Sequence, residues 1–169
     1  QTGGNKVARV KAPKKYQDND DSMSIEDYTI FIKSIIDNWL LFCDEVFLNI
    51  GILATNKKSI SQILFDYSDL HKDNIYWVKT TSTPQGLHSG IMTLLVEPIF
   101  CFGLNGSRKF KNAQFKGTVG NVIQGSNNTS NEFSDSHNAG FPVYLPSDII
   151  TKFTKTGSIV TDCFMGTGT

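Results

Sequence analysis

A run of apolar residues at spacings of three and four marks the first regular element of the chain. The run extends from Tyr28 to Leu40, where the apolar side chains would form one wide stripe along a helix of about five turns. Ser24 is suited to cap this helix, and Asp27 stands three residues later in a capping-box arrangement. The pattern therefore predicts a long helix that begins after Ser24 and packs one face against a core.

Shorter apolar segments follow and alternate with helical patterns. Four of them predict strands, at residues 46–51, 74–79, 98–103 and 158–162. The first is closed by glycine and is apolar throughout, which is typical of a buried parallel strand. Further helices are predicted over 59–67 and from Leu145 onward. This alternation favours an α/β fold in which helices cover both faces of a mostly parallel sheet.

The stretch from Asn105 to His137 interrupts this alternation. It is rich in Asn, Ser and Gly and contains few large apolar residues. The composition predicts a long connection with one short strand, and connections of that length are usually functional or mobile. The total length of 169 residues suits a single domain, 1–169, and no internal repeat is visible.

Composition narrows the class of protein. Hydrophobic residues make up 39% and charged residues 19% of the chain, which is ordinary for a soluble globular protein. No apolar run approaches the roughly 18–20 residues of a membrane span. Cys43, Cys101 and Cys163 lie far apart and have no histidine cluster beside them. They favour reduced thiols in a cytoplasmic protein and argue against a zinc site.

Charge is balanced overall but uneven along the chain. Sixteen basic and sixteen acidic residues cancel, which argues against wrapping nucleic acid by bulk charge. Residues 1–21 nevertheless form a basic-then-acidic segment, and its basic residues are Lys6, Arg9, Lys11, Lys14 and Lys15. This segment is either a solvated arm or a loop that contacts phosphates.

A second basic cluster lies between Arg108 and Lys116, where it is interleaved with Phe110 and Phe115. The cluster is either a solvated hairpin or a surface that stacks bases and binds phosphates.

The final segment, IVTDCFMGTGT, carries the most chemical information. Two alternating glycines just after an apolar strand let the backbone approach a ligand closely. In nucleotide-binding α/β folds, the helix that follows such a turn directs its free N–H groups at the ligand. The segment lacks the Gly-Lys-Ser/Thr of a P-loop and the third glycine of a dinucleotide fingerprint. By itself it fits a ligand loop or a glycine-rich tail.

The segment that precedes it makes the interpretation more specific. HNAGFPVYLP, a helix and then GSIVTDCFMGTGT resemble the adjacent motifs of amino-group DNA methyltransferases, in particular those of the permuted β-type order. The family patterns are H-x-A-x-F-P-x-x-L and D-P-F-x-G-S-G-T. Cys163 stands where the family has proline and Thr167 where it has serine. The segments DDSMSIEDYTIFIKSIIDNW, EVFLNIG, NIYWVKTTSTPQ and VEPIFCFGLNG also resemble family blocks, in the right order.

The resemblance implies a Rossmann-like fold with a mixed, mostly parallel sheet that includes an antiparallel hairpin. It also implies transfer of a methyl group from S-adenosylmethionine to the exocyclic amine of adenine or cytosine in DNA. Such enzymes turn the target base out of the duplex and align donor and acceptor for in-line displacement. Carried over by position, the residues of the donor pocket are His137, Ala139, Phe141, Pro142, Asp162, Phe164, Gly166, Thr167, Gly168 and Thr169.

One family motif is absent from the sequence. The catalytic D/N/S-P-P-Y/F tetrapeptide does not occur, because all five prolines are isolated. No catalytic residue is therefore assigned. We expect the chain to be an internal fragment, incomplete at both ends and inactive alone. Residues 105–136 fall where β-type enzymes place target recognition, and the basic residues of 1–21 would assist DNA binding.

The resemblance further implies an intracellular protein of prokaryotic or viral type that needs DNA but no metal and no membrane. It leaves the target base, the recognition sequence and a homodimer open. One alternative is a catalytically silent, methyltransferase-like subunit that binds nucleic acid beside an active partner. Another is an unrelated Rossmann-type protein that binds a nucleotide.

Overall fold

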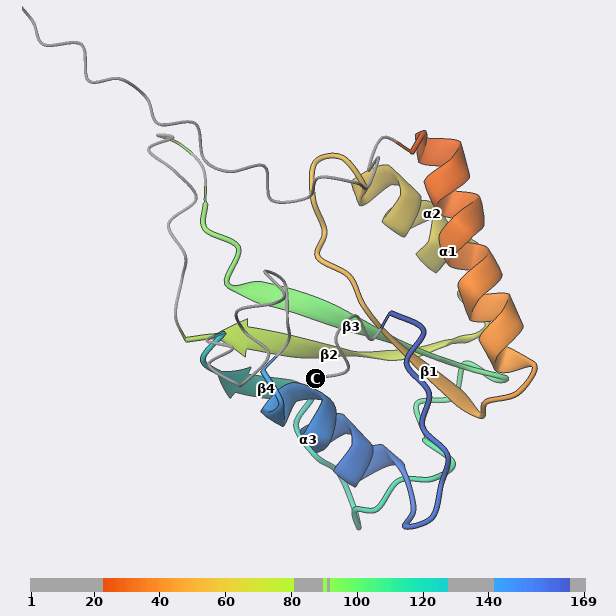
Figure 1. The fold of residues 1–169 in the computed structure, drawn as a ribbon, viewed down its shortest axis with the longest axis vertical. Coiled ribbons are helices and arrows are strands. Elements are labelled where there is room, and N and C mark those ends of the chain that lie inside the picture. Colours follow the sequence, from red (N-terminus) through yellow and green to blue (C-terminus); the bar gives the residue numbers. More distant parts are fainter. Residues whose placement is uncertain (1–22, 81–89, 91, 128–141, 165–169) are drawn as a thin grey trace, which may run out of the picture.

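The structure is a computed structural model, which describes residues 23–80, 90, 92–127 and 142–164 (Figure 1). Its elements are a mixed sheet and helices on both sides of that sheet. None of the described helices is long and apolar enough to cross a membrane.

Helix α1 (Ile25–Leu40) begins where the capping pattern predicts it. The hydroxyl of Ser24 accepts a hydrogen bond from the backbone N–H of Asp27 (3.0 Å), and it also donates to the Asp27 carboxylate (2.9 Å). Ile32, Ile36 and Leu40 are buried on the inner face of the helix. The predicted cap and the predicted core-facing stripe are confirmed.

The sheet contains four described strands, β1 (Glu45–Asn49), β2 (His71–Lys79), β3 (Val96–Gly103) and β4 (Val122–Gly125). Their order is β1-β3-β2-β4. β3 pairs antiparallel with both β1 and β2, whereas β4 pairs parallel with β2. β1, β2 and β4 therefore run in one direction and β3 in the other. The α/β fold with a mixed sheet and an antiparallel β2–β3 hairpin is confirmed, but the described sheet is not mostly parallel, because two of its three strand pairings are antiparallel.

The strand expected at 46–51 is present as β1, but its described pairing differs from the prediction. β3 is the strand that pairs with β1 among the described residues, and it runs antiparallel. The reason is topological, since the return strand of the hairpin lies between β1 and β2. An apolar run predicts that a strand is buried, but it does not predict the direction of its neighbour.

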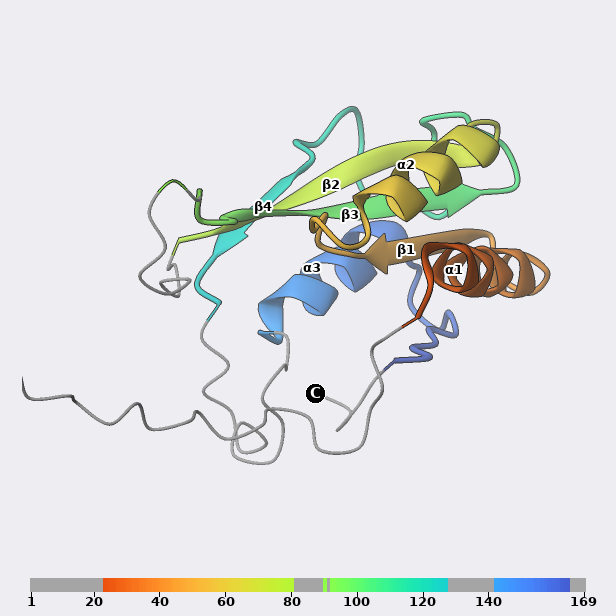
Figure 2. The same cartoon turned by 90° about the horizontal axis from the view of Figure 1, so that it is seen from above.

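Helices cover both faces of the sheet, as Figure 2 shows. Alternation along β3 divides the core, because successive side chains of a strand point to opposite faces. Phe100 and Phe102 pack with α1 and α2 (Lys57–Asp66) on one face. Ile99 and Cys101 pack with α3 (Tyr144–Phe153) on the other. The prediction of a sheet covered on both faces is confirmed.

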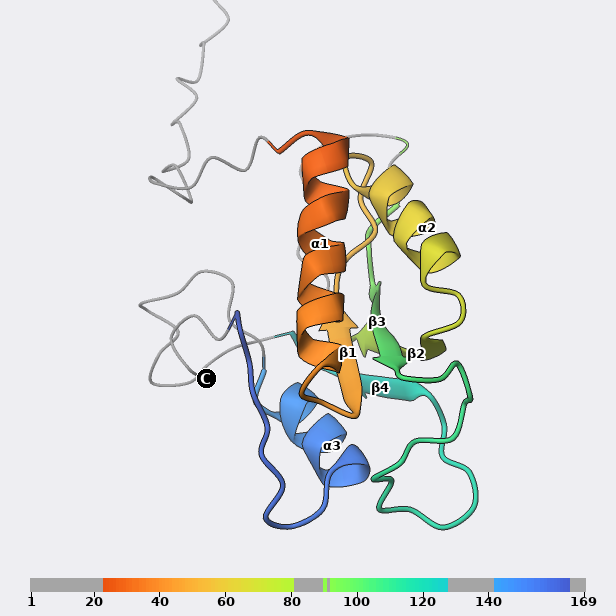
Figure 3. The ribbon, with the colours of Figure 1, turned by 90° about the vertical axis from the view of Figure 1, so that its right-hand side faces the viewer.

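The strand predicted over 158–162 is absent. Residues 158–162 follow α3 without regular structure, and the Ile159 side chain is 93% exposed. A strand needs a neighbour that satisfies its amide and carbonyl groups, and no described residue pairs with this segment. Figure 3 shows the chain returning from the end of α3 along the side of the molecule.

Candidate functional site

The carboxyl ends of β2 and β4 lie side by side. Lys79, the last residue of β2, is in register with Gly125, the last residue of β4. α3 begins at this edge with Tyr144, and Pro142 is buried just before it. In open α/β sheets, ligands bind outside the carboxyl ends of the strands. This edge is therefore a candidate binding site.

One hydrogen bond ties the start of α3 to the sheet. The indole N–H of Trp77 donates to the hydroxyl of Tyr144 at 2.8 Å. Trp77 is 4% exposed on the α3 face of β2. The Tyr144 ring also lies directly over Gly125, where an added Cβ would approach the ring to 2.5 Å. Glycine at this position allows the aromatic ring and the strand backbone to come this close.

A partly buried ion pair lies next to this contact. The Lys79 ammonium pairs with the Glu97 carboxylate, and the two side chains are 16% and 18% exposed. The same ammonium lies 4.8 Å from the centre of the Trp77 ring. Glu97 is opposite Trp77 in the β2–β3 register, which explains how three residues from two strands meet. The pair neutralises the lysine charge at this edge.

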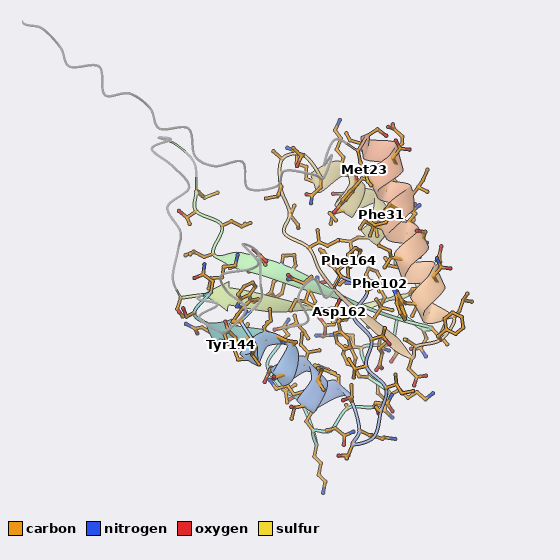
Figure 4. The ribbon with its side chains drawn as sticks, in the orientation of Figure 1. Met23, Phe31, Phe102, Tyr144, Asp162 and Phe164 are labelled. Carbon is orange, nitrogen blue, oxygen red and sulfur yellow. The ribbon has the colours of Figure 1, made fainter. Side chains whose placement is uncertain are left out.

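The described part of the glycine-rich motif lies elsewhere. The carboxylate of Asp162 accepts a hydrogen bond from the backbone N–H of Phe164 at 2.8 Å, so the segment turns at this point. The Phe164 ring is 59% exposed, and it makes an edge contact with Phe31 of α1 at 6.2 Å between ring centres. Figure 4 shows Tyr144 beside the end of β4 and Phe164 nearer to α1.

The structure does not join the two described parts of the predicted donor pocket. No hydrogen bond, ion pair or ring contact among the described residues links Pro142 to Asp162 or to Phe164. The remaining predicted pocket residues lie outside the described ranges: His137, Ala139, Phe141, Gly166, Thr167, Gly168 and Thr169. The same holds for the predicted DNA-contacting residues Lys6, Arg9, Lys11, Lys14 and Lys15. A pocket that joins both motifs stays a prediction.

The second basic cluster, between Arg108 and Lys116, lies near the amino end of β2, at the opposite end of the strands. Phe110 and Phe115 pack their rings against Phe153 of α3, at 4.6 and 5.7 Å between ring centres. Both rings are therefore partly buried against the core beneath the loop, and both also line the pocket beside it.

The cations of this loop are exposed and partly paired. Arg108 forms an ion pair with Asp73, and Lys111 pairs with Asp44 at 2.6 Å. The Lys111 ammonium holds the pKa of the Asp44 carboxyl below its usual value. A pocket of about 660 Å³ lies between this loop, the first residues of β2 and the end of α3.

The described ranges contain one buried thiol and no three-residue metal-ligand cluster. Burial raises the pKa of the Cys101 thiol to about 12, so this cysteine stays protonated and inert at neutral pH. No group of three His, Cys, Asp or Glu side chains within 23–80, 92–127 and 142–164 is arranged to hold a metal ion.

The residues in contact at the carboxyl ends of β2 and β4, here called the edge cluster, are Trp77, Lys79, Glu97, Gly125 and Tyr144. Sequence reasoning missed three of them: Glu97, Gly125 and Tyr144. One signal was present, because Trp77 and Lys79 are two residues apart on a strand and so share a face. Nothing in the sequence paired them with Glu97 or with Tyr144, since those contacts depend on strand register and on where α3 lies.

The chain is similar to DNA methyltransferases both in sequence and in fold. The family model N6_N4_Mtase, described as DNA methylase, matches residues 5–169. Among solved structures, PvuII DNA methyltransferase (cytosine-N4-specific) is similar with a TM-score of 0.61 and 14% sequence identity. The match covers 84% of this chain and 60% of that chain, so this chain spans less than two thirds of the neighbour's length. No curated protein matches the sequence.

Proposed function

Because the chain belongs to the DNA methylase family N6_N4_Mtase over residues 5–169, we propose that it forms part of an enzyme that methylates DNA. The reaction is transfer of the methyl group of S-adenosylmethionine to the exocyclic amine of adenine or cytosine. The family match carries this proposal. The fold shared with the PvuII enzyme supports it, since that similarity extends over 84% of the chain.

The described residues of the two motifs fit the chemistry of the donor. S-adenosylmethionine combines an apolar, aromatic adenosyl group with a positively charged sulfonium and an amino-acid end. The half-exposed ring of Phe164 offers apolar surface, and the exposed carboxylate of Asp162 offers complementary charge. Pro142 would contribute a second apolar wall at the carboxyl ends of β2 and β4. When bound, the donor supplies the methyl group, and the residues around it hold the reacting atoms in line.

The assignment of Phe164 to the donor pocket can be tested with a single substitution. We expect Phe164→Ala to weaken binding of S-adenosylmethionine, since the ring exposes apolar surface. The matched control is Phe42→Ala, because Phe42 is 84% exposed and follows α1 outside both motifs. Isothermal titration calorimetry measures both variants. Equal donor affinity in the two variants would contradict the assignment of Phe164.

The catalytic step is proposed to need residues that this sequence does not contain. The family motif D/N/S-P-P-Y/F accepts hydrogen bonds from the target amine and stacks on the extrahelical base, and no Pro-Pro dipeptide occurs here. We expect the 169-residue chain to bind S-adenosylmethionine weakly and to transfer no methyl group alone. A radiolabelled methyl-transfer assay on DNA of varied sequence measures this, and turnover by the chain alone would refute it.

The protein encoded by the longest reading frame that contains the chain can be tested for DNA methylation. If the tetrapeptide stands upstream, we expect labelled methyl groups in adenine or cytosine of DNA. A complete frame that carries the tetrapeptide, binds the donor and still methylates no DNA would overturn the proposal. A degenerate tetrapeptide would favour the alternative of a silent subunit with an active partner.

DNA binding by the basic arm is a separate part of the proposal. Alanine at Lys6, Arg9, Lys11, Lys14 and Lys15 should weaken binding and flatten its salt dependence, by roughly 0.9 in the log–log slope for each phosphate that the arm no longer neutralises. Lys57 and Lys58 offer a control, because both are exposed on α2. Fluorescence anisotropy of labelled duplex at several salt concentrations measures the slopes. If the two sets of variants had equal slopes, the arm would be a solvated segment.

Residues 105–136 are proposed to contribute to target recognition. The described part of this region contains β4, which extends the sheet beside β2. Residues 105–125 therefore run from the amino end of β2 to the carboxyl ends of β2 and β4, near which α3 begins.

A further inference from the structure

We infer that the hydrogen bond from Trp77 to Tyr144 positions the start of α3, and with it Pro142, for binding of the S-adenosylmethionine donor. This inference rests on the proposed function. It assigns Trp77 and Tyr144 as positioning residues, because they act through Pro142 and the backbone that precedes α3.

The start of α3 depends on a tertiary contact. Its N-cap residue, Val143, offers no capping side chain, and no side-chain cap hydrogen bond is present. The local bonds are between backbone groups, from Leu145 N–H to the Pro142 carbonyl (3.0 Å) and from Ser147 N–H to the Val143 carbonyl (3.2 Å). These bonds shape the turn, but they do not tie it to the sheet. The Tyr144 hydroxyl does so through Trp77 (2.8 Å), beside the buried side chain of Leu145, which packs in the core against the sheet.

The Trp77 indole, which donates this hydrogen bond, is itself held in place. The Trp77 indole is 4% exposed and packs in the core beneath α3. The Lys79 ammonium lies over its ring at 4.8 Å, and Glu97 holds that ammonium in an ion pair. A cation over an indole face is an attractive contact that restrains both groups. The N–H of Trp77 therefore projects from a fixed point at the edge of the sheet.

Tyr144, whose hydroxyl accepts this hydrogen bond, is held by close packing. The Tyr144 ring rests on the backbone of Gly125, where no Cβ intervenes. Tyr144 is the first residue of α3, and Pro142 lies two residues earlier in the chain. The packed ring and its hydrogen bond therefore restrain the backbone two residues after Pro142. Binding sites lose affinity when a supporting contact is loosened, because the site must then be ordered by the ligand.

A titration of the chain with S-adenosylmethionine tests the inference. Two-dimensional ¹H–¹⁵N spectra report dissociation constants into the millimolar range, so weak binding is measurable. We expect Tyr144→Phe, which keeps the ring and removes the hydroxyl, to raise the dissociation constant about fivefold or more. Trp77→Phe should act likewise. The double variant should be no weaker than Trp77→Phe alone, because that change has already removed the bond that Tyr144→Phe removes.

Tyr76→Phe is the matched control. Tyr76 precedes Trp77 on β2, and its hydroxyl accepts a hydrogen bond from the Asn74 side chain (3.5 Å) instead of contacting α3. If the Tyr144 hydroxyl did not position the donor site, Tyr76→Phe and Tyr144→Phe would bind S-adenosylmethionine with the same affinity. Thermal unfolding of each variant verifies that it is folded.

The outcomes separate the inference from the proposed function. If the unmodified chain shows no donor-dependent shifts, the donor site and the inference both fall. If it binds the donor, but Tyr144→Phe binds as tightly as Tyr76→Phe, the positioning role alone is refuted. Additive losses in the double variant would also refute it, since the two residues would then act separately. A selective, non-additive loss supports it.

Discussion

Substituting Gly125 by alanine should disrupt the contact between β4 and α3. The new Cβ would lie 2.5 Å from both Cζ and the hydroxyl oxygen of Tyr144. Carbon atoms in contact lie about 3.5–4.0 Å apart, so the ring must move by roughly an ångström or more. Because Tyr144 is the first residue of α3 and accepts the Trp77 hydrogen bond, the ring cannot move without stretching or breaking that bond.

The expected loss of stability follows from these two effects. Forcing extra atoms into a packed contact costs about 1–3 kcal/mol. Leaving the indole N–H of Trp77 without its acceptor costs about 1–3 kcal/mol more if no other group replaces it. Relief of glycine flexibility in the unfolded chain returns about 0.4–1 kcal/mol. We therefore expect Gly125→Ala to destabilise the fold by about 1–5.5 kcal/mol, which lowers Tm by about 2–22 °C for a chain of this size.

Gly120→Ala is the control for the same chemical change. Gly120 precedes β4, and an added Cβ there would meet nothing within 4 Å. It should leave stability unchanged or raise it by up to about 1 kcal/mol. Urea unfolding followed by circular dichroism measures both variants. A second test combines Gly125→Ala with Tyr144→Ala, where the alanine at 125 should cost little because the obstructing ring is gone.

Equal stability of the two glycine variants would refute this reasoning, since it would place the Tyr144 ring away from β4. An undiminished cost of Gly125→Ala in the Tyr144→Ala background would do the same.

Three further outcomes can be measured on the same chain. Phe102→Ala should cost about 3–5 kcal/mol, because Phe102 is fully buried, whereas the matched Phe42→Ala on an 84% exposed side chain should cost almost nothing by urea unfolding. Ser24→Ala removes the cap of α1 and should cost about 1 kcal/mol, and a smaller effect than that of an exposed mid-helix serine would argue against the cap. Cys101 should resist a thiol reagent that modifies exposed Cys163 in the folded chain. Because burial raises the Cys101 pKa from 9.0 to about 12, its contribution to stability is complete below pH 9 and is lost as pH rises toward 12. Cys101→Ala should therefore flatten the alkaline decline in stability, and identical pH profiles would contradict this.

Helix positions and core faces were predictable from local pattern. The period of apolar residues and the Ser24–Asp27 cap predicted α1, and the structure confirms both. Short apolar runs predicted the positions of β1, β2 and β3. These features depend on neighbours within a few residues, so the sequence carries the information directly. The family resemblance was also visible in the sequence, and the match over residues 5–169 confirms it.

The strand predicted over 158–162 shows where local pattern is insufficient. Ser-Ile-Val-Thr-Asp has the composition of a strand, yet it has no partner among the described residues and remains irregular and exposed. Whether such a segment becomes a strand depends on an edge that can accept its hydrogen bonds. That condition is set by residues distant in the sequence.

The pairing directions of the strands and the contacts of the edge cluster were likewise determined by the tertiary structure. β3 lies between β1 and β2, so an apolar run that suits a parallel strand pairs antiparallel instead. Trp77, Lys79 and Glu97 come together through strand register, and Tyr144 joins them because α3 begins at the ends of β2 and β4. Periodicity reports which side of an element is apolar, but it carries no information about which element will cover that side. The sequence alone thus determined the family, the helices and the buried faces, whereas the contacts that shape the candidate site exist only once distant segments have packed together.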